Sequence, residues 1–348
     1  MDREALSERL LRLSDIRAAS GAEKAMRREL RRMLADKVEL RTDALGNLIA
    51  RQPAEGRPRL RVMVDAHMDE VSLMVVGHAA DGTLLIGGVG GFDARLLPGL
   101  SVVVGEGEAA LPGVIGIKPI HLADDWKSAT PMRRLRVDIG AGKKDEAQRL
   151  APLGTRIYFP TRSERMGARL TGKAFDDRVG CTILATLLLE GPWPVELYGL
   201  FSAQEEVGAR GAQVAAQTLQ PDVAFVLEGT IADDLPREEE RSPTTIVGRG
   251  PALSVFDRRA ATPAPLLRFA VEVAEAGGIP FQLKRPQASG TNASRIHSAG
   301  IGIPTLTISM PSRYIHSPVA LVDPDDLLHT YRLMASILRV ITPAVVQP

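Results

Sequence analysis

Short apolar runs alternate with longer amphipathic segments along most of the chain. Four runs are short, apolar and bounded by polar or turn-forming residues, which is typical of buried strands; they cover residues 60–64, 195–201, 223–227 and 303–309. Helical spacing of apolar residues follows Asp177 and recurs from about residue 211 and over 264–278. This alternation predicts an α/β fold with a mainly parallel sheet flanked by helices on both faces.

The first 50 residues predict two helices and a hairpin. Leu6, Leu10, Leu11 and Ile16 have nearly helical spacing, and a second helix is expected through Met26, Leu30 and Leu34. Ser20 is expected to cap that second helix, with Glu23 as its capping-box partner. Residues 38–40 and 48–50 predict two strands around the turn at 43–47.

A different pattern occupies the segment from about 72 to 167. Glycines and prolines there separate short apolar runs at 84–86, 102–104, 114–117 and 135–137, which is typical of a small β-barrel or sandwich. We therefore expect a discontinuous α/β domain, residues 1–71 and 168–348, with a β-rich insertion at 72–167. The glycine run Gly87–Gly91 lacks the Lys-Ser/Thr of a phosphate-binding loop and is expected to be a flexible turn.

Length and composition add limits to this picture. The 348 residues exceed the usual size of one hydrophobic core, which agrees with two domains. A net charge of +1, from 43 basic and 42 acidic residues, gives no electrostatic reason to expect nucleic acid or an anionic membrane as partner. The single cysteine, Cys181, excludes an intramolecular disulfide, and no apolar run approaches the roughly 20 residues of a membrane span. We expect a soluble, cytoplasmic protein.

Histidines and carboxylates stand where the predicted strands end or a helix begins. They are His67, Asp69, Asp176, Asp177, Glu205, Glu206, Glu228 and His316. Ligands of open α/β sheets gather outside the carboxyl ends of strands, so most of these side chains can converge. Imidazoles with carboxylates suit Zn²⁺, Co²⁺ or Mn²⁺. A two-metal site needs a bridging carboxylate and terminal ligands, and a further acid must stay off the metals as general base. The Glu205-Glu206 pair can divide the last two roles.

Each of these residues alone has an ordinary structural interpretation. A lone His-x-Asp is usually a hydrogen-bonded pair, an Asp-Asp before a helix is usually an N-cap, and a pair of glutamates is usually solvated. The prediction therefore rests on the ordered set. Isolated residues are expected to be structural or exposed: this applies to His78, His121, His297, the buried hydrophobe Cys181 and the charged loop Arg237–Arg241.

Taken in order, the motifs resemble metallopeptidase family forty-two, the tetrahedral aminopeptidases with glutamyl, leucyl and deblocking activities. The matching stretches are residues 66–71, 117–122, 137–141, 172–180, 203–211, 302–305 and 311–317. The resemblance covers nearly the whole chain. It implies a zinc-aminopeptidase-like core of the phosphorylase/hydrolase type with an inserted β-barrel.

The resemblance also implies roles for the site residues. Asp176 would bridge two divalent ions, zinc being expected and cobalt or manganese the alternatives. The Asp176-Asp177 peptide would be cis. His67 and Glu228 would hold one ion, and Glu206 and His316 the other. Glu205 would be the general base, and Asp69 would bond to His67 and fix its tautomer.

The same resemblance implies short peptides as substrates, cleaved at a free N-terminus. Residues 72–167 would form a dimerisation domain, and similar proteins assemble dimers into dodecamers. The chain departs from the common family pattern at Glu228, where many members have aspartate. It departs again at Ser289 and Asn292, where glycine and aspartate are frequent.

Three other functions can be weighed against an aminopeptidase. A related dinuclear carboxypeptidase or N-acyl amino-acid deacylase would share most ligands, although those enzymes usually carry an α/β lid domain and not a β-rich insertion. A catalytically silent assembly protein is disfavoured by the complete ligand set and Glu205. Some relatives carry an endoglucanase label, but glycosidases need two free carboxyl groups at a set separation.

Overall fold

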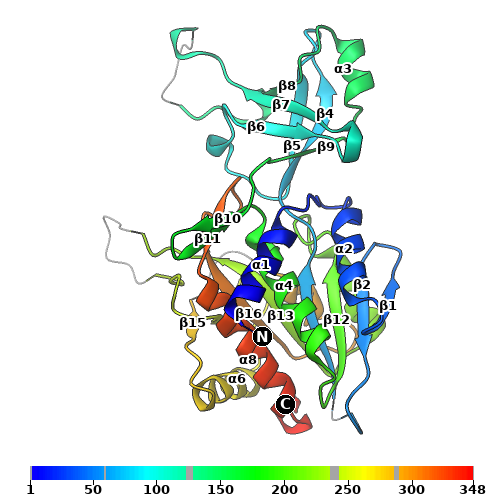
Figure 1. The fold of residues 1–348 in the computed structure, drawn as a ribbon, viewed down its shortest axis with the longest axis vertical. Coiled ribbons are helices and arrows are strands. Elements are labelled where there is room, and N and C mark those ends of the chain that lie inside the picture. The colour runs from blue at the N-terminus through cyan, green and yellow to red at the C-terminus, as the bar shows by residue number, and fades with distance from the viewer. Residues whose placement is uncertain (1, 59, 123–127, 236–242, 286–289, 348) are drawn as a thin grey trace.

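The computed structural model describes residues 2–58, 60–122, 128–235, 243–285 and 290–347. An α/β body and a β-barrel lie end to end, and the barrel stands above the end of the sheet at the top of the view in Figure 1. The sequence run Arg237–Arg241 and Ser289 lie outside the described residues.

A mixed sheet forms the α/β body. Its strands are β1 (Glu39–Thr42), β2 (Leu48–Gln52), β3 (Arg61–His67), β10 (Glu164–Met166), β11 (Arg169–Gly172), β12 (Glu196–Ser202), β13 (Val223–Ile231), β14 (Ala252–Ser254), β15 (Gln282–Lys284), β16 (Thr305–Arg313) and β17 (Ala320–Val322). Their order is β1-β2-β12-β3-β13-β16-β17-β11-β10, with β14 beside β16 and β15 beside β14. The four central strands β12, β3, β13 and β16 are parallel. Their outer neighbours β2, β17 and β14 pair with them antiparallel, and β15 runs parallel to β14.

Helices cover both faces of this sheet. They are α1 (Arg3–Ser14), α2 (Lys24–Leu34), α4 (Phe175–Glu190), α5 (Arg210–Leu219), α6 (Ala264–Ala276), α7 (Ala293–Ile296) and α8 (Pro324–Val340). Alternate residues of the central strands enter two separate cores: Val62 and Phe225 pack with α1, α4 and α8, whereas Met63 packs with α5 and α7. Because these strands are buried on both faces, their sequence reads as a continuous apolar run.

The inserted segment forms a closed antiparallel barrel with its own core. Its strands are β4 (Ser72–His78), β5 (Leu84–Val89), β6 (Ser101–Val104), β7 (Leu111–Gly116), β8 (Arg136–Asp138) and β9 (Arg156–Tyr158), closed in the order β4-β5-β8-β7-β6-β9. Helix α3 (Lys144–Leu150) packs beside it, and short 3-10 turns lie at 94–96, 107–109, 120–122 and 132–134, with another at 343–346. The predicted fold class, an α/β body with an inserted small barrel, is confirmed. No helix in the described parts of the chain is long and apolar enough to span a bilayer.

The predicted cap of the second helix is wrong. Helix α2 begins at Lys24 and no side chain caps it. The Ser20 hydroxyl instead donates to the Asp69 carboxylate at 2.6 Å, and the Glu23 carboxylate accepts from the amides of Gly21 and Gln204. Ser20 and Glu23 therefore make hydrogen bonds near the end of the sheet in place of the predicted capping bonds to the helix.

A buried ion cluster ties α1 and α4 to the end of β3. The Lys173 ammonium lies 2.7 Å from the Glu70 carboxylate, and both side chains are 3% exposed. The Ala18 amide donates to the same carboxylate at 2.8 Å, and Arg178 donates to the Met68 carbonyl at 2.6 Å. This cluster fixes the strand end that carries His67.

Removing one partner of the buried pair should destabilise the fold strongly. Glu70→Gln would leave the Lys173 ammonium buried without its counter-charge, which typically costs about 3–5 kcal/mol, seen as a lower urea midpoint and Tm. The double variant Glu70→Gln with Lys173→Met should recover part of that loss. Arg32→Gln breaks an exposed pair with Glu29 and should leave the midpoint nearly unchanged; an equal loss in both single variants would contradict the prediction.

Candidate metal centre

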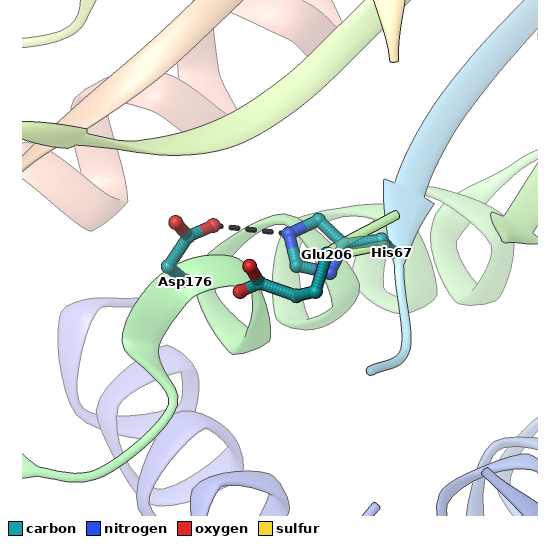
Figure 2. Close-up of side chains that lie close together, drawn as sticks. All are labelled: His67, Asp176 and Glu206. Atoms are coloured by element: carbon teal, nitrogen blue, oxygen red, sulfur yellow. Dashed lines mark hydrogen bonds and ion pairs between the residues drawn. The ribbon is translucent and has the colours of Figure 1, made fainter. Parts of the chain in front are cut away.

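Side chains from five segments meet where the central strands end. His67 is the last residue of β3, Glu228 lies within β13, and Asp176 lies at the start of α4. Glu205 and Glu206 follow β12, and His316 follows β16. Because β3, β12, β13 and β16 run parallel, their carboxyl ends meet at one edge. Figure 2 shows Glu206, Asp176 and His67 pointing toward one another.

Asp176 occupies the middle of this group. Its Oδ1 lies 3.0 Å from His67 Nε2, and its Oδ2 lies 3.4 Å from His316 Nε2. Glu228 Oε1 lies 3.1 Å from the same nitrogen of His67, and Glu206 Oε2 lies 3.6 Å from Nε2 of His316. One carboxylate thus separates two half-sites, each with an imidazole and a further carboxylate. The Asp176-Asp177 peptide bond is cis, as the resemblance implied.

The geometry around His67 favours positive charge between its ring and the neighbouring carboxylates. Its Nδ1 lies 3.0 Å from the Asp69 carbonyl, which can only accept, so Nδ1 carries the hydrogen. In the neutral ring, Nε2 then presents a lone pair to two carboxylate oxygens, and three acceptors face one another. Burial disfavours the imidazolium form, yet Glu228 and Asp176 raise the pKa of His67 above its ordinary value. The position between these groups attracts positive charge, as a metal site does.

Unpartnered oxygens point to the same conclusion. Within the described residues, Glu206 Oε1 and Glu228 Oε2 are buried without a hydrogen-bond donor, although buried polar atoms are normally satisfied. Burial, with the nearby Asp176 charge, raises the pKa of both glutamates well above the ordinary value. The pKa of His316 rises to about 9, because pairing with Asp176 and Glu206 outweighs burial. Divalent ions would relieve this crowding of carboxylates, so the donor set fits them.

Asp177 also lies within reach of this group, since its carboxylate lies close to His67 and Glu228. Its two oxygens already have donors: Oδ2 accepts from the His67 amide at 3.1 Å, and Oδ1 accepts from the Gly180 amide at 2.8 Å. The side chain therefore binds the end of β3 to the first turn of α4. Asp176 and Asp177 have non-helical φ and ψ, so the bond from the Gly180 amide caps the regular part of α4 that follows them, as the ordinary interpretation of Asp-Asp predicts.

Asp69 positions both halves of the site. Its carboxylate accepts from the backbone amides of Glu205 and Glu206, at 3.0 and 3.1 Å, and from the Ser20 hydroxyl. The expected bond to His67 is made by the Asp69 carbonyl, while the carboxylate lies 3.5 Å from Nδ1. One buried residue therefore orients the histidine and the glutamate pair together.

Glu205 and Glu206 point to different places. Glu205 lines a cavity of about 310 Å³ together with Asp176, Glu228 and His316, whereas Glu206 is directed toward His316 and Asp176. Burial raises the pKa of Glu205 to about 7. The Glu205 carboxylate thus faces the cavity, whereas the Glu206 carboxylate belongs to the candidate ligand group.

Left-handed backbone conformations cluster at the same place. Ala174, Gln204 and His316 have φ of 55°, 60° and 56°, each within two residues of a site carboxylate or at the site histidine itself. Such conformations cost non-glycine residues about 1–3 kcal/mol and persist where the surrounding structure holds them. Asp69 bonds to the amide of Glu205 beside Gln204, Lys173 beside Ala174 belongs to the buried ion cluster, and the Gly91 carbonyl accepts from His316.

The sequence did not reveal three residues that line the centre. The run Gly87–Gly91 was expected to be a flexible turn, but Gly87 to Val89 belong to β5. A Cβ on Gly90 would lie 3.1 Å from Glu206 Oε2, and His316 Nδ1 donates to the Gly91 carbonyl at 3.0 Å. Lys284, the third residue, lines the cavity. The two glycines directly after barrel strand β5 therefore form one side of the site, which no local sequence pattern indicates.

The histidines and the cysteine set aside from the sequence have structural or exposed positions. His78 bonds to the Ala151 carbonyl, His297 bonds to the Ala293 carbonyl, and His121 is exposed. Cys181 is buried and its thiol donates to the His67 carbonyl. These expectations are confirmed.

Comparisons with known proteins agree with this picture. The family model described as M42 glutamyl aminopeptidase matches residues 46–333. The structure of aminopeptidase APDkam598 from Desulfurococcus kamchatkensis superposes with a TM-score of 0.93 at 33% identity, covering 99% of this chain and 97% of that one. The TET1 peptidase of Pyrococcus horikoshii, described as assembling into a tetrahedron or an octahedral shell, gives a TM-score of 0.86 at 30% identity over 97% of this chain and 100% of its own.

A curated relative extends the similarity at the sequence level. The lysyl aminopeptidase of Pyrococcus furiosus is 30% identical over 312 residues, which cover 88% of each chain. Since the family model spans most of the chain and the structural relatives span nearly all of it, the chain belongs to the M42 family of aminopeptidases and is a peptide-bond hydrolase.

Proposed function

We propose that this protein is a dinuclear metal-dependent aminopeptidase that removes residues from the N-termini of short peptides. The observation that carries the proposal is the position of Asp176, whose two oxygens lie toward two different imidazoles. Asp176 would bridge the ions, His67 and Glu228 would hold one, and Glu206 and His316 the other. Zinc fits this nitrogen and oxygen donor set, and cobalt or manganese fit it as well.

Bound divalent ions would lower the pKa of a water and stabilise negative charge on the attacked carbonyl oxygen. The chain's own contribution is proton transfer and positioning. The Glu205 carboxylate faces the cavity, where it would take a proton from the attacking water and later return it to the leaving amine. Asp69 holds the Glu205 amide at 3.0 Å, so the base stays aimed at the cavity.

Two further properties belong to this proposal. We infer a homo-oligomer built from dimers through the 72–167 insertion, because the TET1 relative is described as assembling into a tetrahedron or a large octahedral shell. A monomer in analytical ultracentrifugation would contradict this inference. We also propose a cytoplasmic location. A chain with one cysteine cannot form an intramolecular disulfide, and disulfides are typical of proteins in oxidising compartments. Fractionation of cells tests this proposal.

Replacing the proposed base should separate turnover from metal binding. Glu205→Gln keeps the shape but cannot accept a proton, so kcat should fall about 10²–10⁴-fold while metal content stays unchanged. Glu206→Gln is the matched variant at the adjacent residue. It should lower the metal content instead, because Glu206 is a proposed ligand. Steady-state kinetics with elemental analysis measure both, and a near-normal kcat in Glu205→Gln would remove it from the mechanism.

Gly90 should matter for metal affinity although it is no ligand. Its φ is +87°, and a Cβ there would lie 2.8 Å from Val71 and 3.1 Å from Glu206 Oε2. Gly90→Ala should therefore shift Glu206 and weaken metal binding about 10–100-fold, as changes beside metal ligands do. Gly140→Ala is the control, because that glycine also has positive φ but nothing within 4 Å of a Cβ. Equal metal titrations for both variants would contradict the role of Gly90.

Metal removal and blocked substrates distinguish the proposal from its alternatives. Dialysis against a chelator should abolish hydrolysis of leucine p-nitroanilide, and adding Zn²⁺, Co²⁺ or Mn²⁺ should restore it. The N-acetylated anilide should remain uncleaved. Release of acetate or of a C-terminal residue from N-acetylated dipeptides would instead support a deacylase or a carboxypeptidase.

A further inference from the structure

Glu23 is a buried carboxylate beside the loop that carries the glutamate pair. It is 3% exposed and directly precedes α2. Its Oε1 accepts from the Gly21 amide at 2.7 Å and from the Gln204 amide at 3.2 Å. Neither the proposed metal ligands nor the proposed proton transfer uses this side chain.

Stability alone explains Glu23 poorly. In the described part of the chain its carboxylate bonds to backbone amides, and no lysine, arginine or histidine pairs with it. Burial raises the pKa of Glu23, and the nearby Asp69 charge raises it further. A buried carboxylate without a counter-charge is costly. Glu70 is equally buried, but it has the counter-charges of Lys173 and Arg178, at 2.7 and 3.5 Å.

Three consecutive backbone amides of the glutamate loop end on two buried carboxylates. The Gln204 amide donates to Glu23, whereas the Glu205 and Glu206 amides donate to Asp69. Successive amides beside a left-handed residue form concave seats for anions, and Gln204 has φ of 60°. Glu23 therefore holds the strained residue that comes immediately before the proposed base.

The turn that carries Glu23 is itself held from the barrel side. Residues 19–22 form this turn, which is closed by a bond of 2.8 Å from its last amide to its first carbonyl. Gly21 has φ of +78°, as the third position of a type II turn requires. Arg156 of β9 donates to the Ser20 carbonyl at 2.9 Å. The backbone next to Glu23 is therefore fixed from the opposite side.

We propose that Glu23 is a positioning residue for the proposed general base: by holding the Gln204 amide, it keeps the Glu205 carboxylate directed into the cavity. This inference rests on the proposed function, in which Glu205 transfers the proton. Glu23 is not among the described residues that line the cavity, so it acts through the loop. Asp69 does not replace it, because the bonds of Asp69 end at the next two amides.

Removing the acceptor should lower turnover without removing metal. With metal saturating, Glu23→Ala should reduce kcat for leucine p-nitroanilide by up to about 10²-fold, the effect of misplacing a catalytic group by about 1 Å. KM and metal content should stay at the wild-type values. Glu23→Gln keeps a side-chain carbonyl that accepts from the same amides, so it should recover most of the lost kcat. Steady-state kinetics and elemental analysis measure these quantities.

Asp326→Ala is the matched control. Asp326 is also fully buried, and its carboxylate accepts from the Gly248 and Gly250 amides, both at 2.7 Å. It lies outside the cavity lining. Its loss should lower Tm, as the loss of Glu23 does, but should leave kcat at the wild-type value.

Three results would overturn the proposal. One is an equal fall of kcat in Glu23→Ala and Asp326→Ala, which would make the effect a general loss of stability. Another is a Glu23→Gln variant as impaired as Glu23→Ala, because the charge and not the hydrogen-bond acceptor would then matter. The third is a metal content that falls in step with kcat, which would assign Glu23 to the support of the ligand Glu206.

Two further measurements keep the test decisive. Hydrogen exchange resolved to single amides in the wild type does not depend on any variant folding; the Gln204 amide should exchange as slowly as those of Gly248 and Gly250, and rapid exchange would contradict the proposal. A normal kcat in Glu205→Gln would overturn the proposed base itself. Lost turnover in Glu205→Gln with a wild-type kcat in Glu23→Ala would overturn the role of Glu23 alone.

Discussion

Electrostatic repulsion among carboxylates is the constraint on which the rest of this structure depends, because these side chains crowd around two imidazoles at one edge of the sheet. Asp176, Glu206 and Glu228 lie within a few ångströms of His67 or His316, and like charges at such distances in a buried site cannot all remain ionised without cations. The protein meets the constraint with a rigid frame. The Glu70–Lys173 pair and the Asp69 bonds fix the strand end and the glutamate pair before any ligand is present.

The barrel is part of that frame. Its strand β5 runs up to Gly90 and Gly91, which contact Glu206 and His316. Glycine is favoured at position 90, because its φ is +87° and a Cβ there would lie 2.8 Å from Val71 and 3.1 Å from Glu206 Oε2. The His316 side chain is 40% exposed, and the Gly91 carbonyl holds its Nδ1 while Nε2 faces Asp176 and Glu206. The insertion consequently shapes one half-site directly, whatever it contributes to assembly.

Most of the α/β body could be predicted from the chain because its central strands are apolar on both faces. Two examples are the apolar runs Val62 to Val64 and Val223 to Leu227, which can be assigned as buried strands from the sequence alone. The polar residues directly after such runs mark the edge of the sheet where the candidate ligands lie. The failures share a cause. Ser20 bonds to Asp69, Gly90 abuts Glu206, and Lys284 reaches the cavity. These pairings are separated by many residues, so local spacing could not reveal them.

Two of the departures from the common family pattern, Glu228 and Asn292, are explained by their neighbours. Glu228 is longer than the frequent aspartate, yet its Oε1 lies 3.1 Å from His67 Nε2, so the cluster is complete. Asn292 donates from its amide to the Asp65 carboxylate at 2.7 Å and to the Ser202 hydroxyl at 2.8 Å. An aspartate there would place a second carboxylate against Asp65, whose pKa burial already raises to about 6, and the pair would need a shared proton. The amide supplies a donor instead, and its hydrogen bond opposes the rise that burial causes in the pKa of Asp65.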